Sequence, residues 1–264
     1  MLMQARLLLA ALSAAWLCAA PAEPTLAQDV PNIAAASDLQ FVLEEAAAAF
    51  EEESGRTVRI AFGSSGNFVR QIRQGAPFEM FLSADESFVR NLAAAALTDG
   101  EGNLYAVGRI VIVVPHGSPL KPDGTLADLR AALADGRVQK FAIANPEHAP
   151  YGRRAQEALR HAGLWDLLQD KLVLGENVSQ AAQFATSGDA EGGIVAYSLA
   201  LSPKIAAVAA YDLIPDGWHQ PLRQRMVLLK GAGETARQFY AFVASPAGRD
   251  ILKRYGFVLP GETM

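Results

Sequence analysis

From residue 28 onward, the hydrophobic positions of this chain alternate between short runs typical of β-strands and longer stretches with helical spacing. Residues 32–36 form the first apolar run of strand length. From Asp38, apolar residues recur at helical spacing as far as Phe50, and Gly55 is the expected stop. Because strands and helices continue to alternate along the chain, the pattern predicts an α/β fold whose sheets are largely parallel.

Two β-type runs, 109–115 and 224–229, are predicted to cross between two clusters of strands and helices. Further strands are expected at 57–62, 79–82, 140–144, 172–174, 193–197 and 206–211. One further helix is expected to end at Gly75 and another to begin after Ser83, and others are expected at 126–134, 151–161, 178–186, 234–244 and 247–255. Two clusters joined by two crossings predict two lobes, each a mostly parallel sheet flanked by helices, with the crossing strands as hinge. Residues 28–109 and 225–264 would form lobe I, and residues 110–224 lobe II.

The N-terminal residues 1–27 have the pattern of a cleaved signal peptide. Arg6 precedes an apolar run over residues 7–20, which ends in a small-x-small pattern at Ala27. This run is shorter than the ~20 residues of a membrane span. An uncleaved anchor is the alternative, and the residues before Cys18 lack the small side chains of a lipoprotein site. Because Cys18 is the only cysteine, the exported chain would hold neither a disulfide nor a cysteine metal site.

Charge and motifs exclude several classes of function. The net charge of −5 argues against nucleic-acid binding, which needs a basic face. The four histidines have no metal-ligand spacing, and His148 is expected in a solvated turn. No phosphate-binding or dinucleotide glycine motif is present. Residues 63–66, Gly-Ser-Ser-Gly, lack the spacing of a nucleophile elbow.

Four predicted helices begin directly after a strand, with small, hydroxyl-bearing or glycine residues at the turn. These starts are 37–38, 64–67, 150–152 and 177–179. A helix start presents unpaired N–H groups and a partial positive charge, which favour an anion. The alternative is ordinary capping, since Ser and Asn are common N-cap residues. If two starts from each half faced one cleft, they would form a nest of neutral donors for a small oxyanion.

These segments, in order along the chain, resemble the periplasmic molybdate-binding proteins of ABC transporters, which have the type 2 periplasmic binding protein fold. The resemblance rests on residues 34–37 (AAAS), 62–65 (FGSS) with 70–72 and 75–77, 81–85 (FLSAD), 145–152 (NPEHAPYG), 193–195 (GIV) and 254–257 (RYGF). The stretch 145–152 is the most distinctive of them.

The resemblance implies a non-enzymatic, monomeric binding protein that captures molybdate or tungstate in the periplasm. It would deliver the anion to a membrane permease, with no other cofactor and no nucleic-acid partner. In this family the anion is held by serine hydroxyls and backbone amides. Carried over to this chain, Ser37 and Ser65 would donate their hydroxyls, and Tyr151 and Val178 their backbone N–H groups.

Two positions depart from the family pattern. Many members have a tyrosine ligand directly after Gly-Ile-Val, whereas here Ala196 holds that place and Tyr197 follows. Strand alternation would turn Tyr197 away, although a bulge near Ala196 would return it to the site. Tyr151 is therefore predicted to be the main tyrosine contact of the second lobe. Asp38 is unusual beside an anion, so its carboxylate would have to point away or accept from a protonated ligand.

Two other functions stay open. The anion could be sulfate or phosphate, and Asp38 is the only candidate acceptor for the proton of a phosphate. The chain could instead be a secreted hydrolase that uses Ser65, although no base is in evidence. The sequence does not distinguish molybdate from tungstate.

Overall fold

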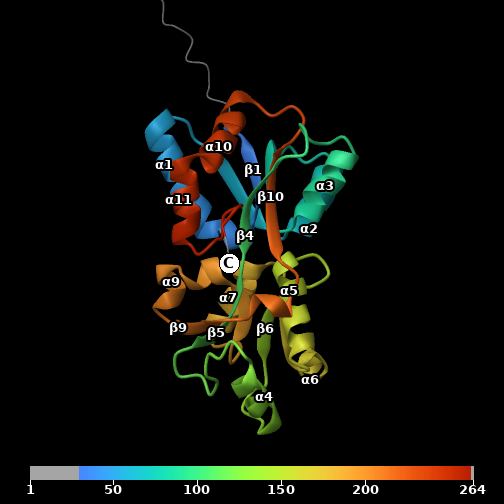
Figure 1. The fold of residues 1–264 in the computed structure, drawn as a ribbon, viewed down its shortest axis with the longest axis vertical. Helices are drawn as coiled ribbons and strands as arrows, with labels where there is room; N and C mark the ends of the chain where they lie inside the picture. The colour runs from blue at the N-terminus through green and yellow to red at the C-terminus, as the bar shows by residue number, and fades with distance from the viewer. Residues whose placement is uncertain (1–29, 263–264) are drawn as a thin grey trace, which may run out of the picture.

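The computed structural model describes residues 30–262, so the predicted signal peptide lies outside the described residues. Two lobes stand one above the other, and the chain passes between them twice (Figure 1). Each lobe is built on a five-stranded sheet flanked by helices. The predicted two-lobed α/β architecture is therefore confirmed. Within residues 30–262, no helix is both long and apolar enough to cross a membrane.

The first sheet has the strand order β2-β1-β3-β10-β4. Its strands are β1 (Asn32–Ala36), β2 (Arg59–Gly63), β3 (Met80–Ser83), β4 (Asn103–Gly108) and β10 (Leu222–Leu228). The first three are parallel, as predicted, while β10 runs antiparallel to both β3 and β4. The reversal arises because β10 brings the chain back from the second lobe.

Helices cover both faces of the first sheet (Figure 1). They are α1 (Gln40–Ser54), α10 (Glu234–Ala244) and α11 (Pro246–Arg254) on one face, and α2 (Ser65–Arg73) and α3 (Glu86–Ala94) on the other. Strand alternation decides which core a residue joins. Ile33 and Ala35 of β1 pack with the first group, and Ala34 between them packs with the second. Burial on both faces explains the uninterrupted apolar run.

The second sheet has the order β7-β6-β8-β5-β9. Its strands are β5 (Ile110–Pro115), β6 (Phe141–Ala144), β7 (Leu172–Gly175), β8 (Gly193–Ala196) and β9 (Ala209–Leu213). Here β6, β7 and β8 are parallel, and β5 is antiparallel to its neighbours β8 and β9. The helices of this lobe are α4 (Ala127–Ala134), α5 (Pro150–His161), α6 (Trp165–Leu168), α7 (Val178–Thr186), α8 (Tyr197–Ala200) and α9 (Pro203–Ala206), with short 3-10 turns at Gln169–Lys171 (η2) and Asp216–Trp218 (η3). A further 3-10 turn, Ser37–Leu39 (η1), follows β1 in the first lobe.

The crossings differ in detail from the prediction. The first consists of two strands, because β4 ends at Gly108 in the first sheet and β5 begins at Ile110 in the second. The sequence did not reveal β4. The second crossing precedes β10, which lies wholly in the first sheet, so the predicted lobe boundary at residue 225 falls inside this strand.

Two strand predictions need correction. Residues 206–211 were expected to be a strand, but Pro203 begins the short helix α9, which Ser202 caps, and the strand β9 starts only at Ala209. The expected strand 193–197 ends at Ala196, because Tyr197 begins α8.

Candidate functional site

The helix starts selected from the sequence converge on one cavity between the lobes. Its empty space is about 180 Å³, part of which is open to solvent. The cavity is lined by Ala36, Ser37 and Asp38 at η1, by Gly63, Ser64 and Ser65 at α2, by Ala149, Pro150 and Tyr151 at α5, and by Ala84 and Val178. The carboxyl ends of β1, β2, β6 and β7 bring these turns together, since ligand sites of α/β sheets form at that edge. Four of the five candidate residues thus meet.

Both first-lobe serines have a hydroxyl that can donate. The Ser65 Oγ accepts the Ala84 N–H at 3.0 Å, and the Ser37 Oγ accepts the Ser179 N–H at 3.3 Å. Both side chains are buried, at 0% and 2% exposure. Because each oxygen is held as an acceptor, its own O–H is left to donate. These contacts fix the position of the two hydroxyls at the cavity wall.

The second lobe supplies N–H groups at two helix starts. At the start of α7, the Asn177 side chain accepts a hydrogen bond from the Gln180 N–H at 3.1 Å, and the Ser37 hydroxyl accepts one from the Ser179 N–H. The Val178 N–H is thus left over. In α5, Pro150 has no N–H, and Arg153 donates to the Ala149 carbonyl. The N–H of Tyr151 is therefore an orphan of the first turn and is available to a ligand.

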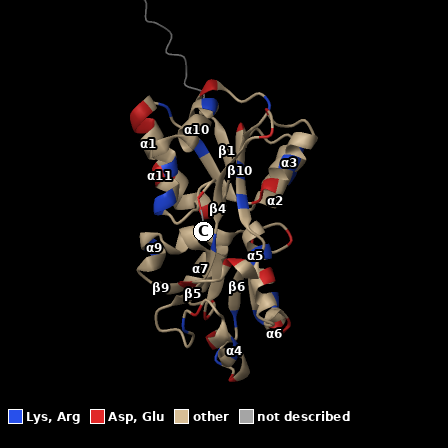
Figure 2. Ribbon diagram, viewed as in Figure 1, with Lys and Arg blue, Asp and Glu red and all other residues tan. Residues whose placement is uncertain are grey.

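The lining contains no cationic side chain among the described residues. Lysines and arginines are interspersed with acidic residues over both lobes (Figure 2). An anion in this cavity would therefore meet neutral donors and helix starts, which are able to hold charge without a counter-ion. The space in it that the centre of a water-sized sphere can occupy is about 10 Å³, far below the ~300–1,000 Å³ of typical pockets for organic ligands. The cavity suits a small inorganic anion.

Asp38 is the one carboxylic acid among the described residues that line the cavity. Its side chain is 1% exposed, and its Oδ2 accepts hydrogen bonds from the Tyr151 hydroxyl at 2.9 Å and from the Gln224 amide at 2.7 Å. Its Oδ1 is buried without a hydrogen-bond partner. Burial raises the pKa of Asp38 to about 6, against the lowering effect of these hydrogen bonds. The Tyr151 hydroxyl thus faces Asp38, while its N–H stays at the cavity.

Tyr197, the fifth candidate residue, is not among the residues that line the cavity. Because β8 ends at Ala196, Tyr197 is the first residue of α8, and its side chain packs outside the cavity. Its ring lies 5.5 Å from that of Tyr211, and the Arg109 guanidinium lies 4.7 Å from its centre. The register shift relative to the family pattern is therefore absorbed by a helix start rather than by a strand bulge.

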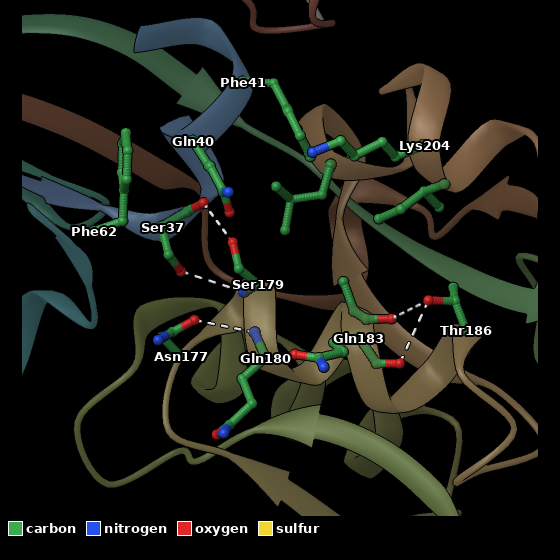
Figure 3. A pocket seen from close by; sticks show the side chains of 13 residues that line it. Ser37, Gln40, Phe41, Phe62, Asn177, Ser179, Gln180, Gln183, Thr186 and Lys204 are labelled. Carbon is green, nitrogen blue, oxygen red and sulfur yellow. Dashed lines mark hydrogen bonds between the residues drawn. The ribbon is translucent and has the colours of Figure 1, made fainter. Parts of the chain in front are cut away.

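A larger groove lies beside the cavity, and Ser37 lines both. Figure 3 shows the side chains that line the groove. Besides its hydrogen bond to the Ser37 Oγ, Ser179 donates its own hydroxyl to the Ser37 carbonyl at 2.8 Å. These two bonds join η1 of the first lobe to α7 of the second. Lys204 and Phe41 also line the groove from opposite lobes. The Lys204 Nζ lies 5.7 Å from the centre of the Phe41 ring.

The sequence did not identify the residues that hold the lobes together. His148, expected in a solvated turn, is only 7% exposed, and its Nδ1 lies 2.9 Å from the Ser64 Oγ. Its carbonyl accepts the Gly66 N–H at 3.0 Å, and a Cβ at Gly66 would lie 2.6 Å from this oxygen. The Arg154 guanidinium pairs with Asp85 at 3.2 Å. The sequence marked segments 64–67, 81–85 and 145–152, which hold most of these residues, but it did not indicate their contacts.

Comparisons with known proteins agree with this geometry. Residues 31–258 match the family of bacterial extracellular solute-binding proteins. The molybdate-binding protein ModA of Rhodobacter capsulatus is 36% identical over 228 residues, covering 85% of this chain and 86% of the relative, and that of Azotobacter vinelandii is 34% identical, covering 86% and 89%. The solved periplasmic molybdate-binding protein of Azotobacter vinelandii superimposes with a TM-score of 0.77 at 31% identity, over 87% of this chain and 99% of that one. This chain therefore belongs to the bacterial extracellular solute-binding protein family that includes these molybdate-binding proteins.

Proposed function

We propose that this protein captures molybdate, or the closely similar tungstate, and delivers it to the permease of an ABC transporter. The observation that carries the proposal is the small cavity lined by helix starts and serines, with no cationic side chain among the described residues that line it. The relatives named as molybdate-binding proteins support the identity of the anion. Ser37 and Ser65 would donate hydroxyls, and Tyr151 and Val178 backbone N–H groups.

Lobe closure would supply both affinity and selectivity. Donors from both lobes reach the anion only when the lobes are together, so binding favours the closed arrangement. Sulfate has the same charge and shape as molybdate but is smaller. It would leave the donors of a cavity fitted to the larger anion too far away, so size would discriminate between them. No cofactor besides the anion enters this proposal.

The proposed setting is the periplasm, with the protein acting as a monomer. The predicted signal peptide and the likeness to a periplasmic relative support export. The closed pair of lobes would be the form that the membrane permease recognises. A net charge of −5 supports the absence of a nucleic-acid partner.

A thermal-shift panel of molybdate, tungstate, sulfate, phosphate and chromate tests the proposed ligand. A ligand that binds only the folded state stabilises it by RT ln(1 + [L]/Kd), about 4 kcal/mol at a thousandfold excess over Kd. We expect molybdate and tungstate at micromolar to millimolar concentration to raise the Tm by several degrees, and sulfate to have a weak effect or none. Greater stabilisation by sulfate or phosphate would show the assignment to be wrong.

A second candidate, a serine hydrolase, rests on one observation. Ser64 lies beside His148, whose Nε2 is 3.5 Å from Glu176, so a serine, a histidine and an acid are aligned. Ser64 belongs to the first lobe and His148 to the second. The array therefore exists only when the lobes are closed, and an ester cannot then enter the small cavity. We therefore favour an interlobe contact. Turnover of 4-nitrophenyl acetate that is lost in Ser64→Ala would support the hydrolase instead.

A further inference from the structure

Beneath the cavity, four buried residues form one hydrogen-bonded network. They are Asp38 in η1, Tyr105 in β4, Tyr151 in α5 and Gln224 in β10, and each is at most 4% exposed. We propose that this network is a clasp that holds the two lobes closed, so that the Tyr151 hydroxyl serves closure and does not bind the anion. The inference rests on the proposed function and assigns positioning roles to Asp38, Tyr105 and Gln224.

The directions of the hydrogen bonds give the clasp a defined order. The Tyr105 hydroxyl donates to the Gln224 Oε1 at 2.6 Å, which turns the Gln224 Nε2 toward the other two residues. That nitrogen donates to the Asp38 Oδ2 at 2.7 Å and to the Tyr151 hydroxyl oxygen at 3.0 Å. The Tyr151 hydroxyl in turn donates to Asp38. Burial holds the pKa of Tyr105 and Tyr151 well above the ordinary value of 10, so both remain donors.

The network links the hinge to the anion site. Tyr105 and Gln224 lie on β4 and β10, the first-lobe strands next to the two crossings. Asp38 directly follows Ser37, and Tyr151 is the only member from the second lobe. A second bond supports the same junction, because the Ser198 hydroxyl of α8 donates to the Asp38 carbonyl at 2.7 Å. Separating the lobes would break the bonds to Tyr151 and Ser198 and leave those within the first lobe intact.

Gly108 shows that closure depends on close approach at this point. It is the last residue of β4, and a Cβ placed on it would lie 2.2 Å from the Tyr151 hydroxyl and 2.8 Å from the Gln224 Nε2. Such a side chain would collide with Tyr151, which arrives only on closure, and would also crowd the Gln224 amide within the first lobe. Gly108 therefore leaves space for the clasp.

The clasp and a direct ligand role predict different kinetics. A bond made only after the lobes close does not affect the encounter with the anion, so its loss should raise the dissociation rate and leave the association rate unchanged. Moreover, a clasp involves Gln224, which does not line the cavity, whereas a direct anion contact by the Tyr151 hydroxyl does not require it.

The experiment measures both rate constants for molybdate by stopped-flow fluorescence in Tyr151→Phe and Gln224→Met. We expect dissociation to be about tenfold faster in each, with association within twofold of the wild-type rate. Tyr211→Phe is the matched control, because it removes a second-lobe tyrosine hydroxyl outside the network, and should behave as wild type. Unchanged dissociation in both test variants would overturn the clasp. Faster dissociation in Tyr151→Phe alone would make its hydroxyl an anion ligand and also overturn it.

A second measurement addresses closure itself. Small-angle X-ray scattering should show the wild-type protein contracting when molybdate is added. Gly108→Ala should fail to contract or require at least a hundredfold more molybdate, with ligand-free circular dichroism unchanged. Gly217→Ala is the control, since a Cβ there meets nothing within 4 Å. Normal contraction of Gly108→Ala would contradict the proposal.

A failure of the proposed function is distinguishable from a failure of the clasp. If molybdate does not bind the wild-type protein, the proposed ligand is wrong. Both measurements are then made with whichever of the four other panel oxyanions raises the Tm most, and the same outcomes decide the clasp.

Discussion

At the scale of single residues, the site combines Ser37 and Ser65, whose hydroxyl oxygens already accept hydrogen bonds, with the buried Asp38, whose pKa is raised to about 6. Ser37→Ala and Ser65→Ala should each weaken molybdate binding by about 1.5–3 kcal/mol, because a hydrogen bond to a charged group is lost. The free energy of ligand-free unfolding should fall by about 1 kcal/mol or more in Ser65→Ala, since the buried Ala84 N–H loses its acceptor. Isothermal calorimetry and ligand-free melting measure the two effects.

Ser87→Ala is the matched control for these serines, because Ser87 is exposed and lies on α3 away from the cavity. Equal affinity in the control and in both site variants would reduce Ser37 and Ser65 to structural residues.

The buried Asp38 predicts a dependence of stability on pH. Its pKa is raised from 3.8 to about 6 by burial, so the folded protein holds the proton more tightly than the unfolded chain. The stabilisation is fully present below pH 3.8 and is lost as the pH rises toward 6 and beyond, by about 3 kcal/mol in all. About 1.4 kcal/mol of this falls between pH 5 and 7.5. Denaturant unfolding of the molybdate-bound protein at these two pH values should show this loss relative to Asp38→Asn. An equal pH slope in the variant would contradict the assignment.

At the scale of elements, local patterns predicted what local physics determines. The helices expected at 178–186 and 234–244 are α7 and α10, because apolar spacing and cap residues are encoded within a few turns. The four helix starts could be recognised for the same reason. Their convergence depends on the strand order of two sheets, which the sequence suggested only through a family resemblance.

The missed features depend on long-range contacts. Nothing near Gln224 or Tyr105 signals that their side chains meet, since they lie 119 positions apart in the sequence and the whole second lobe lies between them. His148 lies in a polar turn, and only the opposite lobe buries it. At Tyr197, a continuous β-type run suggested a strand, although the chain turns into α8 there. Sequence patterns therefore indicated the parts of the site better than the contacts between lobes.

The start of α8 predicts that Tyr197→Phe leaves molybdate affinity within about 0.5 kcal/mol of wild type, the usual scale for a change away from special features. The reason is that the Tyr197 ring packs on Tyr211 and Arg109 rather than at the cavity. Calorimetric titration beside Tyr151→Phe checks this, because the latter should bind about tenfold more weakly through its lost clasp. A tenfold loss in Tyr197→Phe would place this tyrosine at the anion after all.

At the scale of the whole molecule, the two lobes meet through polar contacts around a small cavity. The clasp, the Ser37–Ser179 pair and the His148 contacts all join residues of opposite lobes. Polar contacts of this kind exchange readily for water, and most buried apolar residues pack within one lobe, although a few first-lobe residues, among them Ala36, Ala84 and Leu222, join the core of the second. The lobes are therefore able to separate without unfolding. Affinity for the anion then depends on how strongly these contacts favour the closed arrangement.

The Arg154–Asp85 pair offers a test of this dependence. It joins α5 of the second lobe to the cap of α3 in the first, with side chains 11% and 15% exposed. Asp85→Asn keeps an oxygen for the Ser87 N–H that Asp85 caps at 2.9 Å but removes the charge, and Arg154 retains Glu157. We expect molybdate affinity to fall about fivefold, equivalent to about 1 kcal/mol, with ligand-free Tm nearly unchanged. Asp99→Asn, which breaks an ion pair within the first lobe, should leave affinity at the wild-type value. If both variants lost affinity equally, the effect would come from general charge and not from lobe closure.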